Sequence, residues 1–174
     1  EKNLRRNLML VSDFLDANKN IPASMLLVPA TGTVMSDKLP EHAQMYDAQK
    51  LYETVKSALP DVSFPDLYSA LTEAKASQQV YYRTDHHWTW YGAHTAYKTL
   101  LPDGKYDASP ELFADDFLGT TYSKTLDAAA KPDDVYISRV ADSVTVTADG
   151  KDITLYDMSA SGEKDKYKVF FGGN

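Results

Sequence analysis

The sequence contains no cysteine among its 174 residues. Disulfide frameworks, thiol nucleophiles and structural zinc sites with cysteine ligands are therefore excluded together. Positive charge is also scarce, because 18 lysines and arginines stand against 25 aspartates and glutamates and give a formal net charge of −7. This balance argues against a protein that binds the phosphate backbone of nucleic acids, which needs a basic face.

Long hydrophobic runs are missing as well. No apolar stretch approaches the ~20 residues that a membrane-spanning helix requires, and the first residues lack the pattern of a signal peptide. The chain begins at Glu1, directly before a helical pattern, and ends at Asn174, directly after an apolar run. We therefore expect a fragment of a larger protein, truncated at both ends, with no membrane span in this chain.

What is present has the composition of an ordinary globular protein, with 43% hydrophobic and 25% charged residues. A length of 174 residues corresponds to one domain, on a prior of roughly 150 residues per domain. We expect residues 1–174 to form a single domain. The sequence contains no internal repeat, and nothing in it indicates an oligomeric state.

Helices and short apolar runs alternate over the first hundred residues. Apolar residues at helical spacing predict helices over residues 2–18, 41–58, 66–76 and 89–101. Short strands are predicted at residues 25–28, 62–64 and 80–83. The first of these is an unbroken apolar run, which is typical of a strand buried on both faces. The alternation predicts an α/β fold with helices layered on a mainly parallel sheet.

The character of the sequence changes after residue 102. Residues 112–118 suggest a short helix or an irregular packed segment, and residues 135–137 suggest a strand. Alternating β-branched residues on either side of Asp149-Gly150 predict a β-hairpin insertion at roughly residues 143–156. A final strand is expected at residues 169–171.

Three of the four histidines fall within nine residues, at His86, His87 and His94, and Asp85 comes directly before them. This cluster follows the predicted strand 80–83, and ligands of open α/β sheets gather at the carboxyl ends of strands. Asp85 and His87 are two residues apart, so one tight turn can place the carboxylate against the imidazole. Such a contact fixes the tautomer of the ring and leaves its other nitrogen free to act as a base.

Two other interpretations of these residues stay open. Asp85 is a good N-cap for the helix that follows, with the histidine merely on the surface. Alternatively, Asp85, His87 and His94 supply enough nitrogen and oxygen ligands for an open zinc site. The seven-residue step between the two histidines is not the His-x₃-His spacing that clamps one ion, so we expect no metal.

Residues 82–93 read Tyr-Arg-Thr-Asp-His-His-Trp-Thr-Trp-Tyr-Gly-Ala. This segment resembles the defining segment of the bacterial DHHW proteins, which are related to the SGNH-like acetyltransferases that acetylate alginate and other exopolysaccharides. Weaker likenesses at residues 25–29, 117–123 and 171–174 extend the resemblance over most of the chain. The resemblance implies a three-layer α/β/α fold of SGNH-like, flavodoxin-like type, incomplete in this chain.

The resemblance also implies catalytic roles. Asp85 would orient the imidazole and His87 would be the general base of a Ser-His-Asp triad, whereas His86 would only intervene between them. The nucleophilic serine of that family follows the Asp-His segment on a later turn, so we expect it beyond this chain. No cofactor is expected for such a reaction.

Binding roles are predicted for four further residues. An oxyanion hole needs a backbone N–H and a side-chain amide, which Gly173 and Asn174 would supply if they are not a plain turn. Tyr122 and Trp90 are candidates for lining a sugar-binding groove, although aromatic residues at such positions also serve simply as core.

The function implied by the resemblance is O-acyl transfer or ester hydrolysis on a cell-envelope or secreted polysaccharide. The acyl group would pass through a serine ester. An extracellular or cell-envelope location is implied in the same way. The alternative is a non-catalytic carbohydrate-binding or cell-surface module that keeps the fold without the chemistry.

Overall fold

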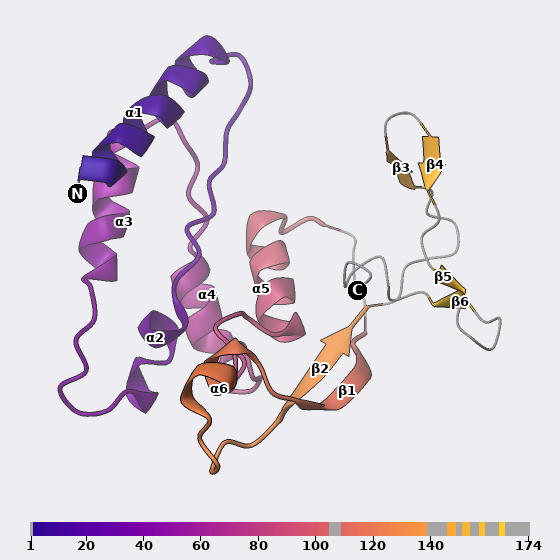
Figure 1. Ribbon diagram of the computed structural model, residues 1–174. Coiled ribbons are helices and arrows are strands. Elements are labelled where there is room, and N and C mark those ends of the chain that lie inside the picture. Colours follow the sequence, from indigo (N-terminus) through magenta and orange to yellow (C-terminus); the bar gives the residue numbers. More distant parts are fainter. Residues whose placement is uncertain are drawn as a thin grey trace.

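The computed structural model describes residues 2–104 and 109–138, together with the backbone of four short strands between residues 146 and 165 (Figure 1). The helices are α1 (Lys2–Ala17), α2 (Thr31–Val34), α3 (Ala48–Ala58), α4 (Leu67–Ala74), α5 (Trp90–Leu100) and α6 (Thr120–Thr125), with a 3₁₀ turn η1 (Ser36–Lys38). The strands are β1 (Glu111–Phe117), β2 (Asp133–Ile137), β3 (Val146–Ala148), β4 (Lys151–Ile153), β5 (Asp157–Met158) and β6 (Lys164–Asp165).

Helix α1 packs along α3 through one apolar stripe (Figure 1). The stripe faces a small core around Val55, Leu59 and Val62 and consists of Leu4, Leu8, Val11 and Leu15. These are the positions whose spacing predicted the helix. None of the residues of α1 is fully buried, so the helix covers the core from one side only.

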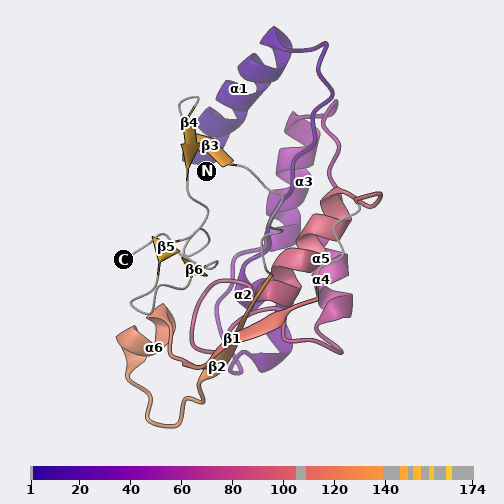
Figure 2. The same ribbon diagram turned by 90° about the vertical axis from the view of Figure 1, so that its right-hand side faces the viewer.

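A second core lies between α4 and α5, which run side by side in both views (Figures 1 and 2). Leu67 and Leu71 of α4 meet Val80 there, and all three side chains are at most 1% exposed. Gly92 allows α5 to approach this closely, because a Cβ atom at that position would lie 2.2 Å from the carbonyl oxygen of Val80. The segment before the histidine cluster is thereby fixed against two helices.

The strands predicted in the first half are reduced to single bridges. Ser24 and Ser63 form one parallel bridge, and Tyr81 pairs with Trp88 in one antiparallel bridge. The prediction that residues 25–28 form a strand buried on both faces is wrong for the described residues, because Val28 is 52% exposed. A parallel ladder needs partners along its whole length, and here the described neighbour pairs at one position only.

Strand β1 also differs from the prediction for residues 112–118, which was a helix or an irregular segment. It pairs antiparallel with β2, from Glu111 opposite Ile137 to Phe117 opposite Asp133, with register shifts on either side of Ala114. The shifts remove the period-two alternation by which a strand is recognised in a sequence. The strand at residues 135–137 is confirmed, and β3 pairs antiparallel with β4 as the predicted hairpin requires, whereas residues 169–171 lie outside the described part.

The predicted helices agree with α1, α4 and α5 to within two residues. The helix expected from residue 41 begins only at Ala48, because Asp47 caps it: its Oδ1 accepts a hydrogen bond from the Lys50 backbone N–H at 2.9 Å. Among the described helices, none is long and apolar enough to cross a membrane.

Candidate active site

Asp85 and His87 lie on a tight loop whose two ends are tied together. The Tyr82 backbone N–H donates to the carbonyl of His87 at 3.2 Å, and the Thr89 N–H donates to that of Val80 at 3.0 Å. Helix α5 begins after Thr89, whose hydroxyl accepts from the Gly92 N–H at 3.4 Å. Thr89 is therefore the N-cap, and the interpretation of Asp85 as the cap of this helix is wrong.

The carboxylate of Asp85 accepts two hydrogen bonds from His87. Its Oδ1 atom accepts from the ring Nδ1 of His87 at 2.5 Å and from the His87 backbone N–H at 2.9 Å. Because a carboxylate only accepts, the proton of the neutral ring sits on Nδ1 and Nε2 carries the lone pair. Asp85 is 6% exposed whereas the His87 side chain is 64% exposed. The contact predicted from the spacing is present, and its arrangement is that of a buried orienting acid and an accessible base.

The second oxygen of Asp85 is held by the start of α6. Oδ2 accepts from the Thr120 backbone N–H and from the Thr120 hydroxyl, both at 2.8 Å. Gly119 makes this approach possible, since a Cβ atom there would lie 2.4 Å from the Cβ of Asp85. Residues 117–123 belonged to the resemblance seen in the sequence, but this bracing role was missed, because no spacing rule links positions 35 residues apart.

These hydrogen bonds determine the charge state of Asp85. Burial acts to raise the pKa of its carboxyl group, but the bonds donated by Thr120 and His87 outweigh burial and hold the pKa well below its usual range. The side chain is therefore a carboxylate throughout the neutral pH range.

A second buried acid anchors the loop one residue earlier. Asp133 of β2 is fully buried, and its oxygens accept from the Thr84 N–H at 2.8 Å, the Thr84 hydroxyl at 2.6 Å and the Arg83 N–H at 3.0 Å. Gln79 donates to the same carboxylate at 2.6 Å. Burial acts to raise the pKa of Asp133, and the hydrogen bonds from Thr84 and Arg83 lower it by more. Strand β2 thus holds the loop on which Asp85 stands.

His86 lies on the exposed side of the same loop. Its ring lies against that of His87 in a tilted arrangement, with centroids 3.9 Å apart, and its Nδ1 is 2.9 Å from the Thr120 hydroxyl. The hydroxyl of Thr31, at the start of α2, donates to the His86 carbonyl at 3.2 Å. Both sides of the loop are therefore attached to neighbouring elements.

The structure does not bring together Asp85, His87 and His94, the three residues of the alternative zinc site. The donor atoms of Asp85, His86 and His87 lie within 4.8 Å of one another, but His94 is not part of this group. Its ring stacks on Trp90 instead, with centroids 4.7 Å apart. Both oxygens of Asp85 are also engaged in the hydrogen bonds above. His94 and Trp90 therefore form part of the packing of α5.

The other predicted binding residues differ in where they lie relative to the Asp85–His87 pair. Trp90 donates from Nε1 to the Ser138 hydroxyl at 2.6 Å, which ties α5 to the end of β2. Tyr122 lies nearer the pair, because its backbone N–H donates to the Thr84 carbonyl at 3.0 Å. Substrate contact by either side chain stays a prediction. Gly173 and Asn174 lie outside the described residues.

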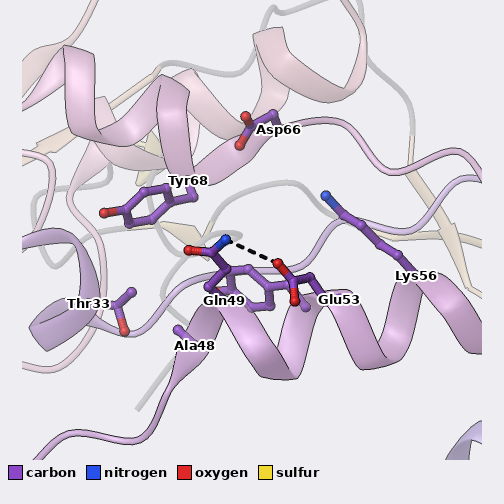
Figure 3. A pocket seen from close by; sticks show the side chains of 8 residues that line it. Thr33, Ala48, Gln49, Glu53, Lys56, Asp66 and Tyr68 are labelled. Carbon is purple, nitrogen blue, oxygen red and sulfur yellow. Dashed lines mark hydrogen bonds between the residues drawn. The ribbon is translucent and has the colours of Figure 1, made fainter.

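Among the cavities of the described residues, one of about 480 Å³ between α4 and α5 is lined by Ser77 and His94 and by no residue of the Asp85 loop. Two others are alternatives to the Asp85–His87 pair as a candidate site. One of about 550 Å³ separates α2 and η1 from residues 79–83, with Lys38 and Arg83 in its lining. The other, of about 310 Å³, lies between α3 and α4, where Gln49 and Glu53 face Tyr68 (Figure 3). Neither lining contains a histidine or a serine. The Asp85–His87 pair is the better candidate for acid–base chemistry.

Comparison with known proteins bears on this geometry. A family described as SGNH hydrolase-like domain, acetyltransferase AlgX, matches residues 1–124. The chain belongs to this family. The SGNH-like α/β fold expected from the sequence is confirmed, and the matched residues include the Asp85 loop, Gly119 and Thr120.

Three similar proteins show what share of such a protein this chain covers. The probable alginate O-acetylase AlgJ of Azotobacter vinelandii is 34% identical over 79 residues, which are 44% of this chain and 20% of that protein. The O-acetyltransferase domain of Pseudomonas putida AlgJ is 23% identical with a TM-score of 0.65, covering 78% of this chain and 55% of that one. A DHHW family protein from Eubacterium siraeum is 26% identical with a TM-score of 0.58, covering 88% and 55%. The chain thus spans about half of these solved structures.

Proposed function

We propose that the protein is a polysaccharide O-acetyltransferase in which Asp85 orients His87 as the general base. The observation that carries this proposal is the 2.5 Å hydrogen bond from His87 Nδ1 to a buried carboxylate whose other oxygen is held by Thr120. Membership of an acetyltransferase family and the similarity to a probable alginate O-acetylase support the same chemistry.

The proposed reaction has two transfers. A serine hydroxyl gives its proton to His87 Nε2 as its oxygen attacks the acetyl carbonyl of the donor, and the proton then passes to the leaving group. An acetyl-serine ester remains. In the second step a sugar hydroxyl loses its proton to His87 and attacks the ester, and the serine recovers the proton. Gly173 and Asn174 are our proposed oxyanion donors, and Tyr122 and Trp90 our proposed acceptor contacts. No serine among the described residues is assigned as the nucleophile.

The exposed Nε2 of His87 suits a polymeric acceptor, because the side chain is 64% open to solvent. A long glycan can reach such a base without entering a closed pocket. We place the activity in the cell envelope or outside the cell, where such polymers lie.

The proposal is tested in the full-length protein that carries the serine, by acetyl transfer from p-nitrophenyl acetate to an oligosaccharide, with the acetylated product measured by mass spectrometry. The His87→Ala variant should lose roughly 10²–10⁴-fold in rate, the usual contribution of a general base. His42→Ala is the matched control, since the His42 side chain is 89% exposed and pairs with Glu41. Equal losses in both variants would contradict the assignment. Saccharide binding without any turnover in the unmodified full-length protein would favour a carbohydrate-binding module instead.

A further inference from the structure

His86 is attached to the same carboxylate as His87, through the hydroxyl of Thr120. That hydroxyl lies 2.8 Å from Asp85 Oδ2 and 2.9 Å from His86 Nδ1. The low pKa of Asp85 keeps it a carboxylate, which only accepts hydrogen bonds. The single proton of the Thr120 hydroxyl must therefore point to Asp85, because two acceptors would otherwise face each other across 2.8 Å.

This arrangement determines the tautomer of His86. With its own proton directed to Asp85, the Thr120 oxygen can only accept from His86, so the neutral ring carries its proton on Nδ1. Its Nε2 then holds a lone pair, as the Nε2 of His87 does. One carboxylate thus sets both rings, directly for His87 and through Thr120 for His86.

The two rings form one exposed surface. Their centroids are 3.9 Å apart with planes inclined at 39°, and the side chains are 63% and 64% exposed. The carbonyl of His86 is held by the Thr31 hydroxyl, and that of His87 by the Tyr82 N–H. Hydrogen bonds therefore hold both the ring and the backbone of each histidine, although only one of the two imidazoles is needed as a base.

We propose that His86 is a specificity-determining residue, whose Nε2 accepts a hydrogen bond from the hydroxyl next to the one that His87 deprotonates. The paired imidazoles would then select acceptor sugars with two adjacent free hydroxyl groups. This inference rests on the proposed function for its catalytic consequence. The tautomer of His86 does not depend on that function.

The tautomer is measured first, by long-range ¹H–¹⁵N correlation spectra of the histidine rings at neutral pH. The unmodified protein should show His86 protonated on Nδ1, and Thr120→Val should lose this preference. Thr121→Val is the matched control, because Thr121 is the exposed neighbour on the same helix. An unmodified protein with His86 protonated on Nε2 would overturn the proposal.

Acceptor selection is measured next in the full-length protein, with methyl β-mannopyranoside and its 3-deoxy analogue. We expect kcat/KM to favour the diol by about threefold to tenfold, the ratio that one net hydrogen bond gives. The His86→Phe variant keeps an aromatic ring beside His87 but has no acceptor nitrogen. It should reduce this ratio to about one. A ratio that persists in His86→Phe would overturn the proposal.

Failure of the proposed function has a different signature. If the unmodified protein transfers acetyl to neither sugar, the same two glycosides are titrated while the Cε1–H resonances of both rings are recorded. A shift of the His86 resonance by the diol and not by the 3-deoxy sugar would support the paired acceptor without any catalysis. Equal shifts, or none, would overturn it.

Discussion

Replacing Asp133 by Asn tests whether the buried carboxylate of β2 holds the catalytic loop. The substitution preserves the shape of the side chain but removes the charge and one acceptor oxygen. In the native chain both oxygens accept hydrogen bonds, from Gln79, Arg83 and both the backbone and the hydroxyl of Thr84. The new amide NH₂ faces donors on one side, so a backbone N–H donor, of Arg83 or Thr84, loses its acceptor, and the Arg83 side chain loses its 3.3 Å ion pair with the carboxylate.

Such a donor costs about 1–3 kcal/mol, and we expect the Asp133→Asn variant to lose about 3 kcal/mol of unfolding free energy. Urea unfolding is followed by the fluorescence of the two tryptophans, Trp88 at the end of the loop and Trp90 at the start of α5. With a urea dependence of about 1–3 kcal/mol per molar, the midpoint should fall by about 1–3 M.

The matched control is Asp134→Asn, the next residue of the same strand, whose side chain is exposed. Surface substitutions of this kind change stability by less than about 0.5 kcal/mol. Indistinguishable midpoints for the two variants would refute the view that Asp133 anchors the loop.

Two further outcomes follow from the same geometry. Gly119→Ala places a Cβ atom 2.4 Å from that of Asp85, so Thr120 must move away from the carboxylate. The rate of acetyl transfer should therefore fall at least tenfold. An unchanged rate in a variant of native stability would contradict the role of Thr120 in holding Asp85. The depressed pKa values of Asp85 and Asp133 contribute stability above the unfolded-state value of about 3.9, which is lost as pH falls through the lower folded-state values. The urea concentration at the unfolding midpoint should therefore fall as the pH is lowered below about 4, and it should fall less steeply in Asp133→Asn. An equal dependence on pH in the two proteins would argue against this linkage.

The local part of the site was predictable from the sequence. Asp85 and His87 are two residues apart, and contacts at that separation depend on one turn. Helices α1, α4 and α5 were likewise visible, because their apolar faces repeat at helical spacing and pack against the two cores of the structure. The resemblance of residues 82–93 to DHHW proteins agrees with the family found by comparison.

The parts that escaped prediction depend on distant pairing. Thr120 and Asp133 reach the loop from 35 and 49 positions away, and neither lies in a pattern that a single sequence reveals. Strand β1 was missed because its register shifts break the alternation. Residues 25–28 were predicted as a buried strand from hydrophobicity alone, which says nothing about whether a partner strand lies beside them.

The dependence of the Asp85 loop on β2 and α6 has a consequence for protein engineering. The four-residue motif at positions 85–88 contains the Asp85–His87 hydrogen bonds but not the groups that hold the pair in place, since Thr120 binds the acid and Asp133 binds the preceding residue, Thr84. Transplanting the motif alone into another scaffold should yield an Asp–His pair without these anchors. The smallest portable unit comprises two segments, residues 79–92 and 117–134, and any designed host must supply anchor points for both.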